Sequence, residues 1–198
     1  MARRIKNATQ NIIDNLFNNG AGSPGNMAAL RATKTIDDRY AQRIWPLMMP
    51  YLSAEWIDND YNYELQAIYQ TLRLYALHQQ GQSDYRGNLL MVSASKKDGG
   101  IELLEALAIL RQDRDERAGV DRQVARVLAA PNLQFLMNAL VRLVKILKAK
   151  KGMIKIDYAQ LAQDLYSFQW GGDSLRHLRF KWGAQYYYSD ALKKEDLK

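Results

Sequence analysis

Apolar residues recur at three- and four-residue intervals along most of the chain, which is the spacing of an amphipathic α-helix. The clearest stripe runs through residues 61–79. The same spacing predicts helices over 11–18, 101–110, 120–130 and 158–170. Three more are expected around Met27 to Arg31, after Pro131 and after the Gly171-Gly172 pair. No convincing alternation typical of a β-strand interrupts this pattern, so the sequence predicts an all-α fold.

Glycine and polar residues divide the helical pattern. A Gly/Pro turn occupies 20–25, and a long polar connection containing Lys96-Lys97 runs from 80 to 100. A connection of that length is either functional or disordered. Asp157 and Gln160 have the spacing of a capping box ahead of the helix at 158–170. We therefore predict two helical lobes or bundles, an N-terminal one at 1–110 and a basic C-terminal one at 111–198, joined by the long connection.

Positive charge is concentrated in the second half of the chain. The formal net charge is +7, yet residues 122–181 alone hold eleven Lys and Arg against three Asp. A leucine-rich stripe runs through these charges from 133 to 147, so they lie on a folded helical surface and not on a polar tail. Such a field attracts polyanions, of which we favour nucleic acid over an anionic membrane. No apolar stretch approaches the roughly 20 residues that span a bilayer.

Composition and motifs indicate neither secretion nor catalysis. Cysteine is absent and no apolar leader follows Met1, so we expect a cytoplasmic protein. The Gly20–Gly25 loop lacks the strand of a dinucleotide site, so no cofactor is predicted. Only two histidines occur, and without cysteine they predict no metal site. His78, at the end of an apolar helix, is interpreted as structural. No nucleophile with an adjacent base is recognisable, so no catalytic residue is assigned.

Several segments, in order, resemble a known family. They are Gly25–Arg31, Tyr69–Gln79 with the sequence YQTLRLYALHQ, Asp121–Val124, Val127–Ala130, Leu140–Leu147, Ile156–Tyr158 and Lys181–Tyr187. Together they are similar to the CasB-type small subunit of Cascade, the type I-E CRISPR surveillance complex. The resemblance implies an all-α, two-lobed and non-enzymatic subunit. It also implies partners: other Cascade subunits, a second copy of the chain, the guide RNA, and the target and non-target DNA strands of the R-loop.

The candidate site consists of basic residues expected to contact phosphates without regard to base sequence. Its centre is predicted at Arg122, Arg126, Arg142, Lys145 and Lys148, with Arg31 matching a basic position of the family and Lys150, Lys151, Arg176 and Arg179 at the margin. Tyr187 and Tyr188 are further candidates for base stacking, whereas Trp182 and Tyr186 are assigned to the core. Two alternatives stay open: a helical scaffold that docks acidic proteins, and an RNA-binding subunit of another ribonucleoprotein.

Overall fold

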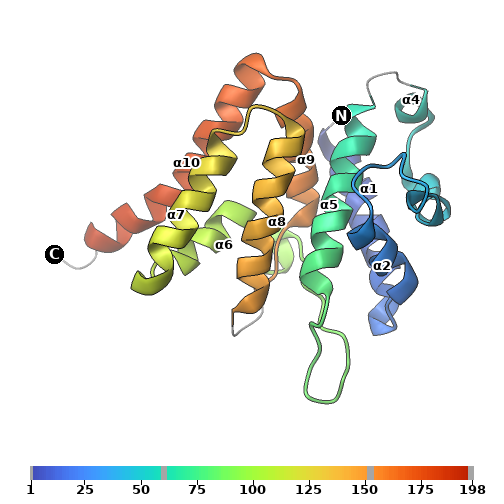
Figure 1. Ribbon diagram of the computed structural model, residues 1–198, viewed down its shortest axis with the longest axis horizontal. Helices are drawn as coiled ribbons and strands as arrows, with labels where there is room; N and C mark the ends of the chain where they lie inside the picture. The colour runs from blue at the N-terminus through green and yellow to red at the C-terminus, as the bar shows by residue number, and fades with distance from the viewer. Residues whose placement is uncertain (1, 59–61, 151–153, 196–198) are drawn as a thin grey trace.

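The computed structural model describes residues 2–58, 62–150 and 154–195, and it confirms the all-α fold (Figure 1). Its α-helices are α1 Ala2–Phe17, α2 Pro24–Ala32, α3 Trp45–Met48, α4 Ala54–Ile57, α5 Tyr63–Gln79, α6 Leu103–Leu110, α7 Arg114–Leu128, α8 Leu133–Ala149, α9 Tyr158–Gln169 and α10 Gly172–Glu195. Within the described segments, no helix is both long and apolar enough to cross a bilayer.

Two helices begin earlier than the apolar pattern predicted. In α1, Ile5, Ala8 and Ile12 follow helical spacing and are buried, so the basic residues at its start belong to an amphipathic helix. In α7, the carboxylate of Asp113 accepts a hydrogen bond of 3.0 Å from the backbone N–H of Asp115. This N-cap starts the helix within the charged stretch that precedes Val120.

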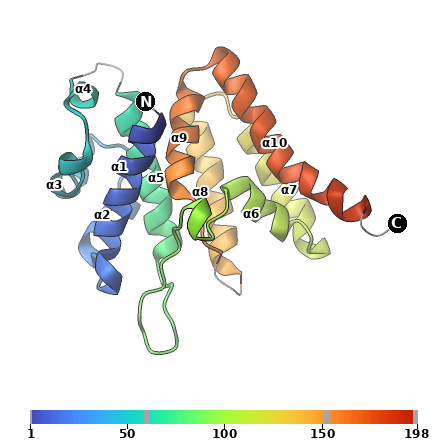
Figure 2. The ribbon, with the colours of Figure 1, turned by 180° about the vertical axis from the view of Figure 1, so that it is seen from behind.

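The helices form two layers. One contains α7, α8, α5 and α2 in that order, and the other contains α10, α9 and α1 (Figures 1 and 2). The central helices α5 and α9 pack against each other across the layers. Their facing sides carry Tyr75 and Tyr158, both fully buried, with ring centroids 5.7 Å apart in an edge-to-face arrangement.

One continuous apolar cluster runs through both layers. Helix α9 packs against α1 and α5, whereas α6 packs against α10. Elements from each half of the chain thus complete the core of the other half. The division into lobes at residue 110 stays a prediction.

Side-chain hydrogen bonds and backbone bridges hold the long connection 80–100 in place. The Gln79 carboxamide donates to the carbonyl of Leu90 (2.8 Å) and accepts from the N–H of Val92 (3.2 Å), which closes a hairpin at the end of α5. Beyond it, Ile156 forms backbone bridges with Ser93 and Ile101 on either side. Gly100 is required there, because a Cβ at this position would lie 2.0 Å from the Ala94 carbonyl oxygen.

A buried carboxylate ties α9 to α10. Asp164, 6% exposed, accepts hydrogen bonds from the Trp182 indole (2.9 Å), from Lys181 (3.0 Å) and from Gln160 (2.7 Å). Lys181 also pairs with Glu102 at 2.5 Å, which brings the start of α6 to the same point. Desolvation opposes the charge of Lys181, but these two carboxylates outweigh it and raise the lysine pKa.

The capping box predicted at Asp157 and Gln160 is only half present. The Asp157 carboxylate does accept from the Gln160 N–H at 2.8 Å. The Gln160 side chain, however, donates to Asp164 one turn further along the helix. The buried charge of Asp164 requires hydrogen-bond donors and draws this side chain away from the cap.

His78 is buried and bonded, as expected of a structural histidine. It is 2% exposed, and its Nδ1 lies 3.1 Å from the Tyr158 hydroxyl. Desolvation, followed by the positive charge of Lys148, lowers its pKa from 6.5 to about 4. At neutral pH the ring is therefore uncharged.

Removing the buried carboxylate should destabilise the fold strongly. In Asp164→Ala, the Trp182 N–H loses its acceptor and Lys181 keeps only Glu102, so we expect a loss of about 3–5 kcal/mol in the free energy of unfolding. Urea titration at neutral pH measures this loss. In the double variant with Lys181→Met, part of the stability should return; a fully additive loss would contradict the coupling.

His78 should make the protein less stable in mild acid. A lowered folded-state pKa means that the unfolded chain binds the proton more tightly, so stability is retained above about pH 6.5 and declines toward pH 4. The expected contribution across this window is about 3 kcal/mol. Urea titrations at pH 7 and pH 4.5 should show a smaller difference for His78→Gln than for wild type. An equal difference would mean that other groups cause the pH dependence.

Candidate nucleic-acid interface

The first cluster of basic side chains lies where α2, α5 and α8 meet. Arg31 of α2, Arg73 of α5 and Lys145 of α8 line one cavity of about 140 Å³. Apolar side chains, including Leu77, form its floor. The helical packing therefore brings together charges that are far apart in the sequence.

Lys148 extends this cluster by one turn of α8. Its ammonium donates to the Gln80 side-chain oxygen at 3.0 Å, while the guanidinium of Arg31 donates to the Ala76 carbonyl at 3.3 Å. Desolvation, followed by the charges of Arg31 and Lys145, lowers the pKa of Lys148. Among the described residues, no carboxylate lies within ion-pair distance of Arg31, Lys145 or Lys148. Their mutual repulsion is therefore not offset by an ion pair with any described carboxylate.

A second cluster continues along α8 and onto α7. Arg126 and Arg142 line a hollow of about 430 Å³ together with Asn138 and the ring of Phe135. Phe135 is 60% exposed, although it is a large apolar side chain. Arg122 is exposed one helical turn before Arg126. The two clusters join through Arg142 and Lys145, three residues apart on α8.

We call this surface the basic track. All of its members belong to the layer of α7, α8, α5 and α2 (Figure 1). Its basic members, in order across the layer, are Arg122, Arg126, Arg142, Lys145, Lys148, Arg73 and Arg31, and the ring of Phe135 lies beside Arg126 and Arg142.

The remaining predicted basic residues have partners within the chain or lie outside the described residues. Lys150 pairs with Glu116 at 2.6 Å, and Arg176 pairs with Asp173 of its own helix. Arg179 donates to the carbonyl of Ala130 at 2.8 Å, which joins α10 to the end of α7. Lys151 falls among the residues that the structure does not describe.

Two members of the surface were not predicted from sequence. Arg73 sits in the apolar helix α5, where a lone arginine beside a buried stripe was a usable signal. Phe135 lies off the leucine stripe of α8 and shares a face with Asn138 and Arg142 at three- and seven-residue spacing. An aromatic residue on a basic helix face was the second available signal.

A separate apolar surface occupies the outer side of α10. Phe180, Tyr187 and Tyr188 are 80%, 44% and 62% exposed and line a shallow hollow with Gly183 and Ala184. The inward positions of the same helix are Trp182 and Tyr186, which are 1% and 0% exposed. Their assignment to the core is confirmed.

The basic track offers guanidinium and ammonium donors together with an exposed ring, which suits a phosphate backbone and unstacked bases. Within the described residues, no group of three His, Asp or Glu side chains is arranged to hold a metal ion.

Comparisons with known proteins identify relatives. The family model of CRISPR-associated protein Cse2 matches residues 26–187. The crystal structure of CasB from Thermobifida fusca is similar at a TM-score of 0.67 and 22% sequence identity, over 94% of this chain and 97% of that one. A Cse2-family protein from Thermus thermophilus has a TM-score of 0.56, with the same identity and coverage. No curated protein sequence gives a match.

Relief of like-charge repulsion should be measurable in the free protein. In Lys145→Gln we expect a gain of about 0.2–0.5 kcal/mol in stability at low ionic strength, because Lys148 loses a like-charged neighbour one turn away. The gain should shrink at high salt, where such charges are screened. Urea titrations at two salt concentrations test this. A loss of stability in Lys145→Gln at both concentrations would contradict the repulsion.

Proposed function

Because this chain belongs to the Cse2 family of CRISPR-associated proteins and is a subunit of a Cascade-type complex, we propose that it holds single-stranded DNA on its basic track while an R-loop is open. The strands concerned are the target strand and the displaced non-target strand of a type I-E complex. The subunit contributes binding and no catalytic step. It acts in the cytoplasm, in antiviral defence, beside the guide RNA, the other subunits and a second copy of itself.

The uncompensated charge of the basic track is the observation that carries this proposal. Arg31, Lys145 and Lys148 lie close enough for their charges to influence one another, and no described carboxylate pairs with them. A phosphate backbone supplies negative charges in series along such a surface. Contacts with phosphates carry no sequence information, as a subunit that works with many guides requires.

Modest contacts suffice for this role. In an R-loop, the guide–target duplex replaces a DNA duplex of nearly equal stability, so small contributions from protein contacts shift the exchange. Arg126, Arg142 and Phe135 continue the surface along α8 and α7. Phe135 supplies an exposed ring on which a base of the displaced strand can stack.

A scaffold that binds proteins is the second candidate, and the exposed rings of α10 favour it. Aromatic residues are enriched at protein interfaces. A partner docked on the α10 rings would leave DNA binding unchanged, whereas an acidic partner docked on the basic track would compete with DNA, so the candidates separate experimentally.

Charge reversal on α8 should weaken DNA binding without loss of fold. For Arg142→Glu/Lys145→Glu, we expect weaker binding to labelled single-stranded DNA, with the slope of log affinity against log salt shallower by about 1.4, because about 0.7 is lost per phosphate contact. Both side chains are exposed, so the unfolding midpoint should change little. Fluorescence anisotropy across a salt series measures the slope.

The matched control is Arg3→Glu/Lys97→Glu. It makes the same change in net charge at exposed positions, on α1 and on the short helix Lys96–Asp98, which lie on the face opposite α8 (Figure 2). It should bind DNA nearly as wild type does. An equal loss of DNA affinity in both variants would mean that net charge alone, and not the position of the charges, causes the effect. An unchanged R-loop lifetime with the α8 variant in a reconstituted complex would refute the proposed role.

A further inference from the structure

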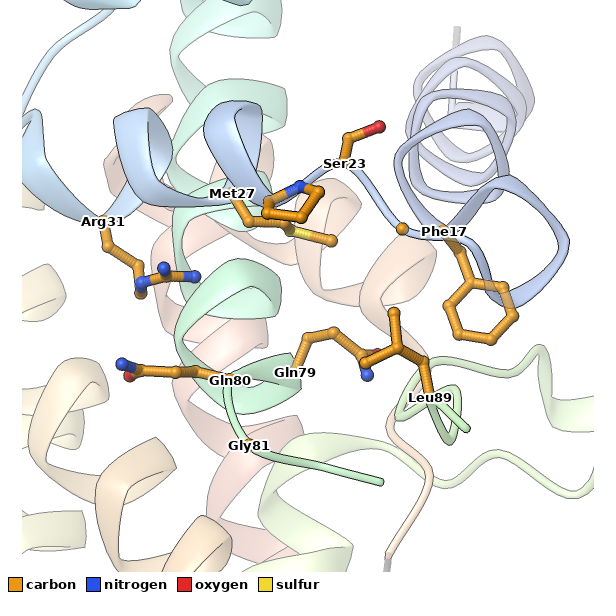
Figure 3. Close-up of a pocket in the computed structure, with 10 residues that line it drawn as sticks. Phe17, Ser23, Met27, Arg31, Gln79, Gln80, Gly81 and Leu89 are labelled. Atoms are coloured by element: carbon orange, nitrogen blue, oxygen red, sulfur yellow. The ribbon is translucent and has the colours of Figure 1, made fainter. Parts of the chain in front are cut away.

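A cavity of about 190 Å³ lies at the lower end of α5, where α1, α2 and the hairpin at 80–90 meet. Figure 3 shows Arg31 and Gln80 at one end of it and Phe17 and Leu89 at the other, with Met27 between them on the α2 side. Most of its lining is apolar. Arg31 and Gln80 supply polar groups at one end, and the Gln79 amide lies close to Leu89 at the other.

The cavity is continuous with the basic track through two residues. Arg31 lines both this cavity and the neighbouring one that contains Lys145. Gln80 lines the cavity and accepts a hydrogen bond from Lys148 at 3.0 Å. A phosphate held by Arg31 and Lys148 would therefore stand at the cavity mouth. The ligand that fits is an anion attached to a flat, largely apolar ring.

We propose that this cavity receives one unstacked pyrimidine base of the single strand held on the basic track, an inference that rests on the proposed function. Size limits the occupant, since apolar protein cavities of about 150 Å³ take up a single benzene ring. A cavity of about 190 Å³ has room for one six-membered base with its substituents. Phe17, Met27 and Leu89 provide the apolar contacts for its faces.

The buried amide of the lining is not available to read the edge of the base, because Gln79 already uses both its nitrogen and its oxygen on the backbone of Leu90 and Val92. Thymine and cytosine should therefore bind equally well. Either pyrimidine of the displaced strand could then occupy the cavity.

Among the residues that line the cavity, Leu89 is the most suitable one for a test by mutation. It lies on the hairpin that Gln79 closes, and its side chain packs over Gly22, where a Cβ would come within 2.6 Å of Leu89 Cδ1. Because Leu89 is only half-buried in a surface hairpin, its truncation leaves the helical core intact. The adjacent Leu90 does not line the cavity, which makes it a matched control.

The experiment compares two strands with identical phosphates, a thymine 15-mer and a 15-mer of abasic sites, bound to the full chain. For wild type we expect about a hundredfold tighter binding of the thymine strand, because one base in the cavity and one on Phe135 each contribute about tenfold. In Leu89→Ala this ratio should fall to about tenfold, whereas Leu90→Ala should keep it. The salt slope should be the same in all three proteins. A cytosine 15-mer should match the thymine strand.

Phe17→Leu is a second variant that keeps the apolar volume but removes the aromatic ring, and it should also lower the ratio. Equal ratios in wild type, Leu89→Ala and Phe17→Leu would overturn this inference while leaving salt-dependent binding, and so the proposed function, in place. Absence of salt-dependent binding to either strand would overturn both. A ratio lowered equally by Leu90→Ala would assign the base contact to the hairpin surface and refute the cavity.

Discussion

The buried Asp164 carboxylate is the interaction on which the arrangement of the helices depends. It lies on α9, whose opposite side packs against α1 and α5, and it holds Trp182 and Lys181 of α10. Lys181 reaches on to Glu102, which is also the N-cap of α6. A charge buried in the core is costly unless its donors are all in place. The position of α9 therefore fixes α10 and α6 together.

This tie has a consequence for the surface chemistry. Lys181 is one of the basic residues that give the second half of the chain its positive excess, yet its charge is paired with the carboxylates of Asp164 and Glu102. Lys150, Arg176 and Arg179 likewise have partners within the chain. By contrast, Arg122, Arg126, Arg142, Lys145 and Lys148, which lie on α7 and α8 of the other layer, have no carboxylate within ion-pair distance among the described residues. The molecule thus separates cations that hold the fold from cations available to a ligand.

The sequence predicted the helices well, but it predicted less well which basic residues are available on the surface. Helical spacing located α5, α8 and α9 because long apolar stripes determine packing, and it also placed Trp182 and Tyr186 inside. It missed α3 and α4, which are too short to show a period, and the start of α7, which depends on the single cap at Asp113. It could not distinguish Lys181 from Lys145, since pairing with Asp164 depends on how α9 and α10 pack. The gathering of Arg31 and Arg73 beside Lys145 depends likewise on contacts between distant helices.

Salt should act in opposite directions on the two surfaces of the free protein, the exposed rings of α10 and the basic track. Phe180 and Tyr188 keep much of their apolar area in water, where excluded salts such as sulfate strengthen association between apolar surfaces. The same salts screen the attraction between cations and phosphates. Concentrated sulfate would therefore screen the charges of the basic track while driving the chain toward self-association through α10, and dilute buffer would do the reverse.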